Sequence, residues 1–126
     1  MTLTITSKVK AAGIYLITPT GSLDSNTYSI LEGRVDMILK DKPKMIAFDM
    51  QNLEYISSMG VRVIAKVQKE LKKNQGQVTL LHLQPQIKKV FDIIKALPSD
   101  KIFASLAELD AYLDHMQKKV KEDLAG

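Results

Sequence analysis

The 126-residue chain has no cysteine, no tryptophan and only two histidines. Without cysteine it can form neither a disulfide nor a thiolate ligand for a metal. His82 and His115 are too few and too far apart for a metal cluster or for a relay to a serine nucleophile. The glycine motifs that bind nucleotide phosphates are also missing. We therefore expect no metal, no cofactor and no enzyme activity, but a protein that acts by binding.

The sequence also lacks long apolar runs and a strong excess of charge of one sign. The first ten residues alternate polar and apolar side chains, and no later run is long enough to span a bilayer. The 18 basic and 14 acidic residues are spread along the chain, without an arginine-rich arm or an aromatic platform. We expect a cytoplasmic protein that binds neither membrane nor nucleic acid directly.

What the sequence does contain is an alternation of strand and helix patterns. Period-two alternation predicts a first hairpin, with its turn at Ala11 to Gly13. Later segments predict strands at 44–50, 78–83 and 101–105, and helices at 25–41, 57–74, 84–97 and 106–120. We expect Asp24 or Ser25 to cap the first helix and Ser105 to cap the last.

The predicted order is ββαβαβαβα, which indicates a single α/β domain over residues 1–126 with a mixed sheet and about four helices. A chain of this length and ordinary apolar content can bury a core without disulfides. We expect order over about 2–120 and a frayed carboxyl-terminal tail.

Asp49 lies near the end of the predicted central strand and has two interpretations. It could be a phosphoacceptor of the receiver type, which would need an acidic pair after an early strand to hold magnesium. The segment "YLITPTG" supplies no such pair. We therefore favour a structural role, in which the Asp49 carboxylate tethers the following loop by hydrogen bonds.

Two adjacent serines begin the second predicted helix. Ser57 suits the N-cap position, Ser58 would be the first helical residue, and Gly60 would allow close backbone approach. A phosphate on Ser58 would be favoured there, because a helix N-terminus offers unpaired amides and positive dipole. Arg62 and Lys66 follow on the same face, which is either solvated or able to meet a phosphoserine or an acidic partner.

Two stretches, "GSLDSNTYSILEGRV" and "FDMQNLEYISSMGVRVI", resemble the STAS domains, and specifically bacterial anti-sigma factor antagonists of the sporulation and stress-response type. The resemblance covers nearly the whole chain. Aligned on Gly60, the phosphoacceptor of that family falls on Ser58, with Asp24 beside it. Ser57 stands where the family usually has aspartate and remains a rival acceptor, and Met59 replaces a small residue.

The resemblance also implies a function. The unphosphorylated protein would bind an anti-sigma factor that is also a serine kinase and so free a sigma factor. Phosphorylation would block binding, and a serine phosphatase would restore it. The implied partner-binding residues are Asp24, Ser57, Ser58, Met59, Gly60, Arg62 and Lys66. The alternative is a STAS module that is not phosphorylated and acts as a scaffold or as a sensor of a nucleotide or lipid.

Overall fold

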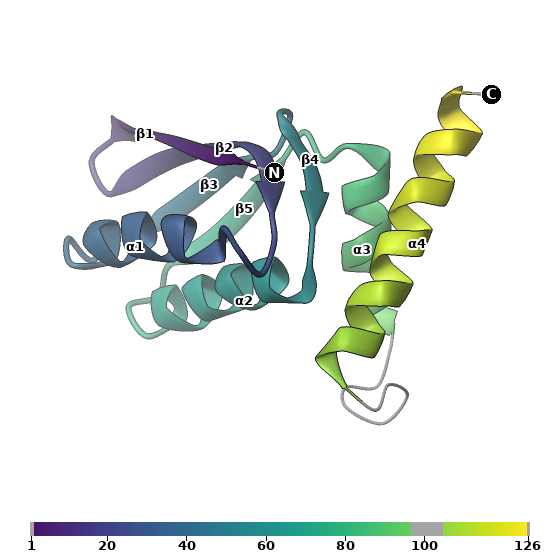
Figure 1. Ribbon diagram of the computed structural model, residues 1–126. Helices are drawn as coiled ribbons and strands as arrows, with labels where there is room; N and C mark the ends of the chain where they lie inside the picture. The colour runs from purple at the N-terminus through teal and green to yellow at the C-terminus, as the bar shows by residue number, and fades with distance from the viewer. Residues whose placement is uncertain (1, 97–104, 126) are drawn as a thin grey trace.

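The computed structural model describes residues 2–96 and 105–125, which form five strands and four helices (Figure 1). The predicted α/β class, with a mixed sheet and four helices, is confirmed. In chain order the elements are β1 (Leu3–Ala11), β2 (Ile14–Leu23), α1 (Tyr28–Leu39), β3 (Met45–Asp49), β4 (Leu53–Ile56), α2 (Ser58–Lys72), β5 (Gln77–Leu81), α3 (Pro85–Ala96) and α4 (Leu106–Ala125).

Strand β2 organises the sheet. It pairs antiparallel with β1 through the predicted hairpin, where Gly13 adopts a positive φ of 76° that glycine accommodates without strain. Its first half pairs in parallel with β3, and its last residues pair in parallel with β4. Strand β5 continues the sheet beyond β3, also in parallel. The carboxyl ends of β2 and β4 therefore lie side by side.

Strand β4 is the element that the predicted order lacked, so the described order is ββαββαβαα. It has only four residues, too short for period-two alternation to stand out. The strand predicted at 101–105 falls outside the described residues except for Ser105.

Helices α1 and α2 cover one face of the sheet, as Figure 1 shows. Apolar side chains from both helices and from the inner face of the sheet form one continuous core. Period-3.6 spacing predicts that seven helical residues face inward, and they are buried: Leu31, Val35 and Ile38 on α1, and Val63, Ile64, Val67 and Leu71 on α2. Tyr28, predicted on the same face of α1, is half-buried. Period-3.6 spacing was sufficient to place both faces.

Helices α3 and α4 pack against each other and lie beside β4 (Figure 1). The outer edge of β4 is closed by side chains. Gln86 donates from Nε2 to the Glu54 carbonyl at 3.0 Å. Gln117 Oε1 accepts from the Ile56 amide at 3.1 Å, while its Nε2 donates to the Ile56 carbonyl at 2.8 Å. These bonds satisfy backbone groups that a further strand would otherwise pair.

The helix ends differ in part from the sequence-based expectations. The N-cap of α1 is Thr27, and Asp24 instead accepts bonds from the amides of Asn26 and Thr27 in the preceding turn. Ser105 caps α4 as predicted, since its Oγ accepts from the Glu108 amide at 3.1 Å. Helix α4 continues to Ala125, past residue 120, where we expected order to end. None of the described helices is long and apolar enough to cross a membrane.

Candidate functional site

The candidate site lies where β2 and β4 end. Leu23 and Ile56 are partners in the parallel register, and the Ser57 amide donates to the Leu23 carbonyl at 2.9 Å. Asp24 and Ser57 therefore follow neighbouring strands at the same edge of the sheet. The structure thus brings together Asp24 and the serine pair, which are 33 residues or more apart in the sequence.

Ser57 and Ser58 place two hydroxyl groups at the start of α2. Ser57 is the N-cap residue, with φ −100° and ψ 177°, and Ser58 is the first helical residue. Each serine is 4% exposed, and neither hydroxyl oxygen has a hydrogen-bond partner among the described residues. The prediction for Ser57 is right about the position and wrong about the capping bond. A buried hydroxyl without a partner costs about 1–3 kcal/mol, which invites a functional explanation.

The N-terminus of α2 is capped by another helix. The Ser58 amide donates to Oδ1 of Asp110, on α4, at 2.8 Å. A carboxylate is favoured at this position because the helix dipole and the free amides are both positive there. The first bond within α2 runs from the Val61 amide to the Ser57 carbonyl at 3.1 Å.

Tyr55 lies next to the serines on β4, where three carboxylates surround it. Burial, the largest cause, together with the charges of Asp114, Asp110 and Asp24 and a hydrogen bond to Asp114, raises the pKa of its phenol to about 12. Nearby negative charges disfavour the phenolate form. The surroundings of the serine pair are therefore acidic.

Gly60 allows α2 to approach the ends of β2 and β4. A Cβ at this position would lie 2.7 Å from Ile56 Cγ1 and 2.7 Å from Leu23 Cγ. The predicted close approach is confirmed, and its reason is packing. Gly60 is buried and Met59 is half-buried, so the first turn of α2 offers little free surface to a partner.

Comparison with known proteins identifies the family. The STAS domain family matches residues 6–109, most of this chain. The chain belongs to the STAS domain family. A protein of Bordetella bronchiseptica named "Putative anti-sigma factor antagonist BtrV" is 31% identical over 84 residues, which are 67% of this chain and 72% of that protein. The STAS match ends just before Asp110, so Asp110 and Gln117 lie beyond it.

Two solved structures share the fold. SpoIIAA, a cell fate determinant of Bacillus in its phosphorylated form, has a TM-score of 0.62 at 20% identity, covering 72% of this chain and 83% of that one. A sulfate transporter family protein of Wolinella succinogenes has a TM-score of 0.55 at 18% identity, covering 88% of this chain and 93% of that one. At these identities the likeness establishes the STAS fold alone.

The basic residues Arg62 and Lys66 on α2 of this STAS domain are both exposed, and Lys66 has acidic neighbours on α1. Lys66 Nζ lies 3.4 Å from Glu32 Oε2 and 3.8 Å from Asp36 Oδ1, both on α1. It therefore joins the two helices, at an exposed position where such pairs contribute little. Arg62 is exposed one turn nearer to the serines. Its contact with a partner stays a prediction.

Asp49 has the structural role that the sequence favoured. Its Oδ1 accepts from the Gln51 amide at 3.1 Å and lies 3.1 Å from His82 Nδ1. Partial burial alone would raise the pKa of this carboxyl, but the bonds from Gln51 and His82 outweigh burial and lower it. In the described part of the chain, no group of three or more acidic, histidine or cysteine side chains could hold a metal ion.

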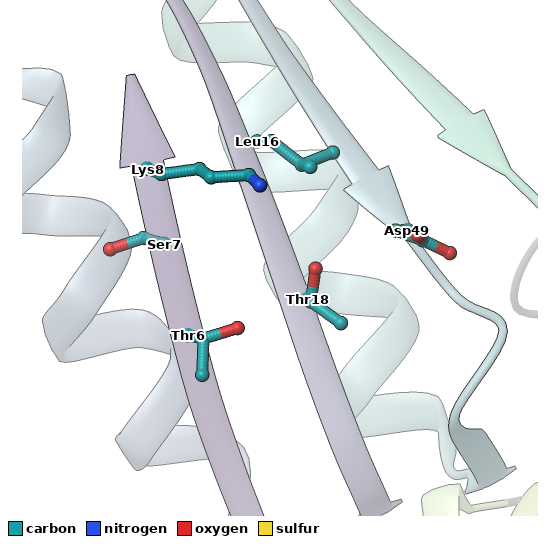
Figure 2. A pocket seen from close by; sticks show the side chains of 6 residues that line it. All are labelled: Thr6, Ser7, Lys8, Leu16, Thr18 and Asp49. Atoms are coloured by element: carbon teal, nitrogen blue, oxygen red, sulfur yellow. The ribbon is translucent and has the colours of Figure 1, made fainter. Parts of the chain in front are cut away.

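A hollow lies on the face of the sheet away from α1 and α2 (Figure 2). Its volume is about 250 Å³. Figure 2 shows Lys8 extending across β2, while Ser7 points the other way, toward α1, where its Oγ accepts from Arg34 at 2.9 Å. The residues that line this sheet-face hollow are Thr6, Ser7, Lys8, Leu16, Thr18 and Asp49. It does not include the serine pair.

The sequence did not reveal three residues of the site, Tyr55, Asp110 and Gln117. Asp110 and Gln117 are two helical turns apart, on either side of the buried Leu113. The sequence feature that could have indicated Asp110 and Gln117 is an acidic and a carboxamide side chain next to the apolar face of the last helix. Only the fold shows that this face meets β4 and α2.

Proposed function

We propose that this STAS protein is an anti-sigma factor antagonist, which binds an anti-sigma factor serine kinase and is switched off by phosphorylation of Ser58. It acts in the cytoplasm as a binding module rather than an enzyme. Family membership and the 31% identity to BtrV of Bordetella bronchiseptica support this function. SpoIIAA, itself an anti-sigma factor antagonist with the same fold, has a phosphorylated form.

The observation that carries the proposal is the Ser58 hydroxyl, buried without a partner in the first turn of α2. The amides of Met59 and Gly60 precede the first bond within the helix and can donate hydrogen bonds to the oxygens of a phosphate. A phosphate adds about −1.5 to −2 charges, here beside Asp24 and Asp110. Such a concentration of negative charge would repel a partner that tolerates the neutral serine.

Mass spectrometry after incubation with ATP and the anti-sigma serine kinase of the same genome tests the phosphorylation. We expect one phosphate, on Ser58. Ser58→Ala should abolish incorporation, whereas the matched variant Ser57→Ala should retain it. Phosphate on Ser57 alone would assign the switch to Ser57 instead of Ser58. No phosphate on either serine would contradict the proposed phosphorylation.

Binding is tested with an acidic substitution. Ser58→Asp should weaken binding to the kinase at least tenfold, with an unchanged far-ultraviolet circular dichroism spectrum. Ser58→Ala should bind like the parent protein, which separates the charge from the loss of the hydroxyl. Equal affinity of the two variants would argue against charge repulsion. A serine phosphatase should restore binding of the phosphorylated protein.

The second candidate is a ligand sensor, which the sheet-face hollow favours. Thr6 and Thr18 contribute hydroxyl groups to its lining, Lys8 an ammonium group and Asp49 a carboxylate, which suits a small polar ligand. Lys8→Ala should then abolish binding of that ligand, as measured by calorimetry against nucleotides and lipid headgroups. Kinase binding that is unaffected by Lys8→Ala would leave the antagonist function as the better account.

A further inference from the structure

Helix α4 covers the serine site through two polar side chains. Asp110 accepts from the Ser58 amide at 2.8 Å, and Gln117 bonds to both backbone groups of Ile56. Leu113 lies between them in the sequence, on the same face of α4, and is fully buried. One face of α4 therefore contacts the last residue of β4 and the first residue of α2.

The acceptor oxygen beside this helix is closed to another protein. Ser58 is 4% exposed and its hydroxyl oxygen is buried. Phosphoryl transfer requires direct contact between the Ser58 oxygen and the γ-phosphorus of ATP in a kinase active site. The oxygen has to become accessible before this contact can form.

The Asp110 carboxylate also occupies an amide that a phosphate on Ser58 would use. Both groups are anions that bind to the same N-terminus of α2. Two such anions in contact repel each other strongly where water is excluded. The docked Asp110 carboxylate and a phosphate on Ser58 therefore compete for the same amides at the N-terminus of α2.

We propose that α4 is an internal cover of the phosphoacceptor, so that the docked helix and phosphorylated Ser58 exclude each other. This inference rests on the proposed function and adds its regulation. In the reaction the Ser58 oxygen forms a bond to the γ-phosphorus of ATP, and the bond from that phosphorus to the bridging oxygen breaks. The hydroxyl proton passes to a base of the kinase, and ADP leaves.

The coupling is reciprocal. If docking of α4 makes phosphorylated Ser58 less stable relative to the free hydroxyl, phosphorylation must weaken docking by the same free energy. Phosphorylation would then release α4 from β4 and α2. A partner could detect this change of shape as well as the new charge.

The first experiment needs no kinase. Phosphoserine is placed at position 58 during translation, and hydrogen exchange is measured on the full-length protein. We expect amides of Leu109 to Val120 to exchange about tenfold faster or more, with Met45–Asp49 unchanged. Phosphoserine at Ser29, which is exposed on α1, is the matched control. Equal protection of α4 in the two phosphoproteins would contradict the proposal that α4 covers Ser58.

The second experiment compares rates of phosphorylation by the anti-sigma serine kinase. Asp110→Ala removes the cap and should speed incorporation about fivefold, the factor that corresponds to a typical cap. Asp123→Ala, on an exposed position of the same helix, should leave the rate unchanged. Equal rates of phosphorylation for both variants would contradict the proposal that α4 covers Ser58. No incorporation into any variant would instead contradict the proposed function, and hydrogen exchange would still decide the inference.

Discussion

Helix α2 is attached to the sheet by four buried apolar side chains, whereas α4 reaches the serine site through a carboxylate and a carboxamide. The hydrophobic contact of α2 with the sheet has no preferred direction, and its stabilising effect increases with the apolar area that is buried. The contact of α4 with the serine site depends on a few hydrogen bonds to backbone groups, which water or a phosphate can replace. The comparison indicates that α1 and α2 belong to the apolar core, and that α4, which adds Leu113 to that core, is held at the serine site by contacts that can exchange.

The largest effect is expected from damage to the core. Leu71 on α2 is 1% exposed, and Leu71→Ala should lower the free energy of unfolding by about 2–5 kcal/mol. Urea denaturation measures this loss. The matched variant Leu124→Ala, on a leucine that is 64% exposed on α4, should change it by less than about 0.5 kcal/mol. Similar losses from both variants would contradict the distinction between core and attached helix.

A smaller and more local effect is expected at Gln117. Gln117→Ala leaves the amide and carbonyl of Ile56 without partners, at a cost of about 1–3 kcal/mol. Undocking of α4 lets water reach these groups, so hydrogen exchange should rise in α4 and not in α2. Gln68→Ala, on an exposed position of α2, is the control. A parallel rise in both helices would show that they unfold as one unit.

Ionisation of Tyr55 reports the docked state of α4. Absorbance at about 295 nm, with Tyr55→Phe as the reference, should show a pKa of about 12. Asp114→Ala should lower the pKa without bringing it to the ordinary 10.0, because burial is the larger cause. Since the folded-state pKa exceeds the unfolded value, the free energy of unfolding should decrease as pH rises from 10.0 to about 12. An unchanged pKa in Asp114→Ala would place α4 away from Tyr55.

The smallest effect is expected from the ion pairs between α1 and α2. Lys66→Ala should cost less than about 1 kcal/mol, because the lysine side chain is 49% exposed and water screens its charge. The small loss should shrink further in high salt. A loss comparable to that of Leu71→Ala would show that charge, as well as apolar burial, holds these helices together.

Much of the core and the hairpin could be predicted from the sequence because local patterns determine them. The spacing of Val63, Val67 and Leu71 was sufficient to place the inner face of α2, and Gly13 was sufficient for the turn. Strand β4 was not predicted, because four residues are too few for a period-two alternation to be recognised. The pairing of β4 with the end of β2 depends on the whole fold.

The candidate site was predicted in part. The order of Ser57, Ser58 and Gly60 at the helix start was readable because N-cap preferences are local. The bond that replaces the Ser57 cap was not, since Asp110 lies 52 residues beyond Ser58. The contacts of Lys66 with Glu32 and Asp36 could not be predicted either, because these acidic neighbours belong to another helix.

The two glutamines along β4 have a consequence for self-association. A strand edge with free amides and carbonyls can template pairing with a strand from another molecule. Gln86 and Gln117 block this by bonding to Glu54 and Ile56 through side chains, which cannot propagate a sheet. When α4 departs, the two bonds from Gln117 are lost and the bond from Gln86 remains. The released form would then present a short open edge, and its solubility would depend on how quickly that edge is covered again.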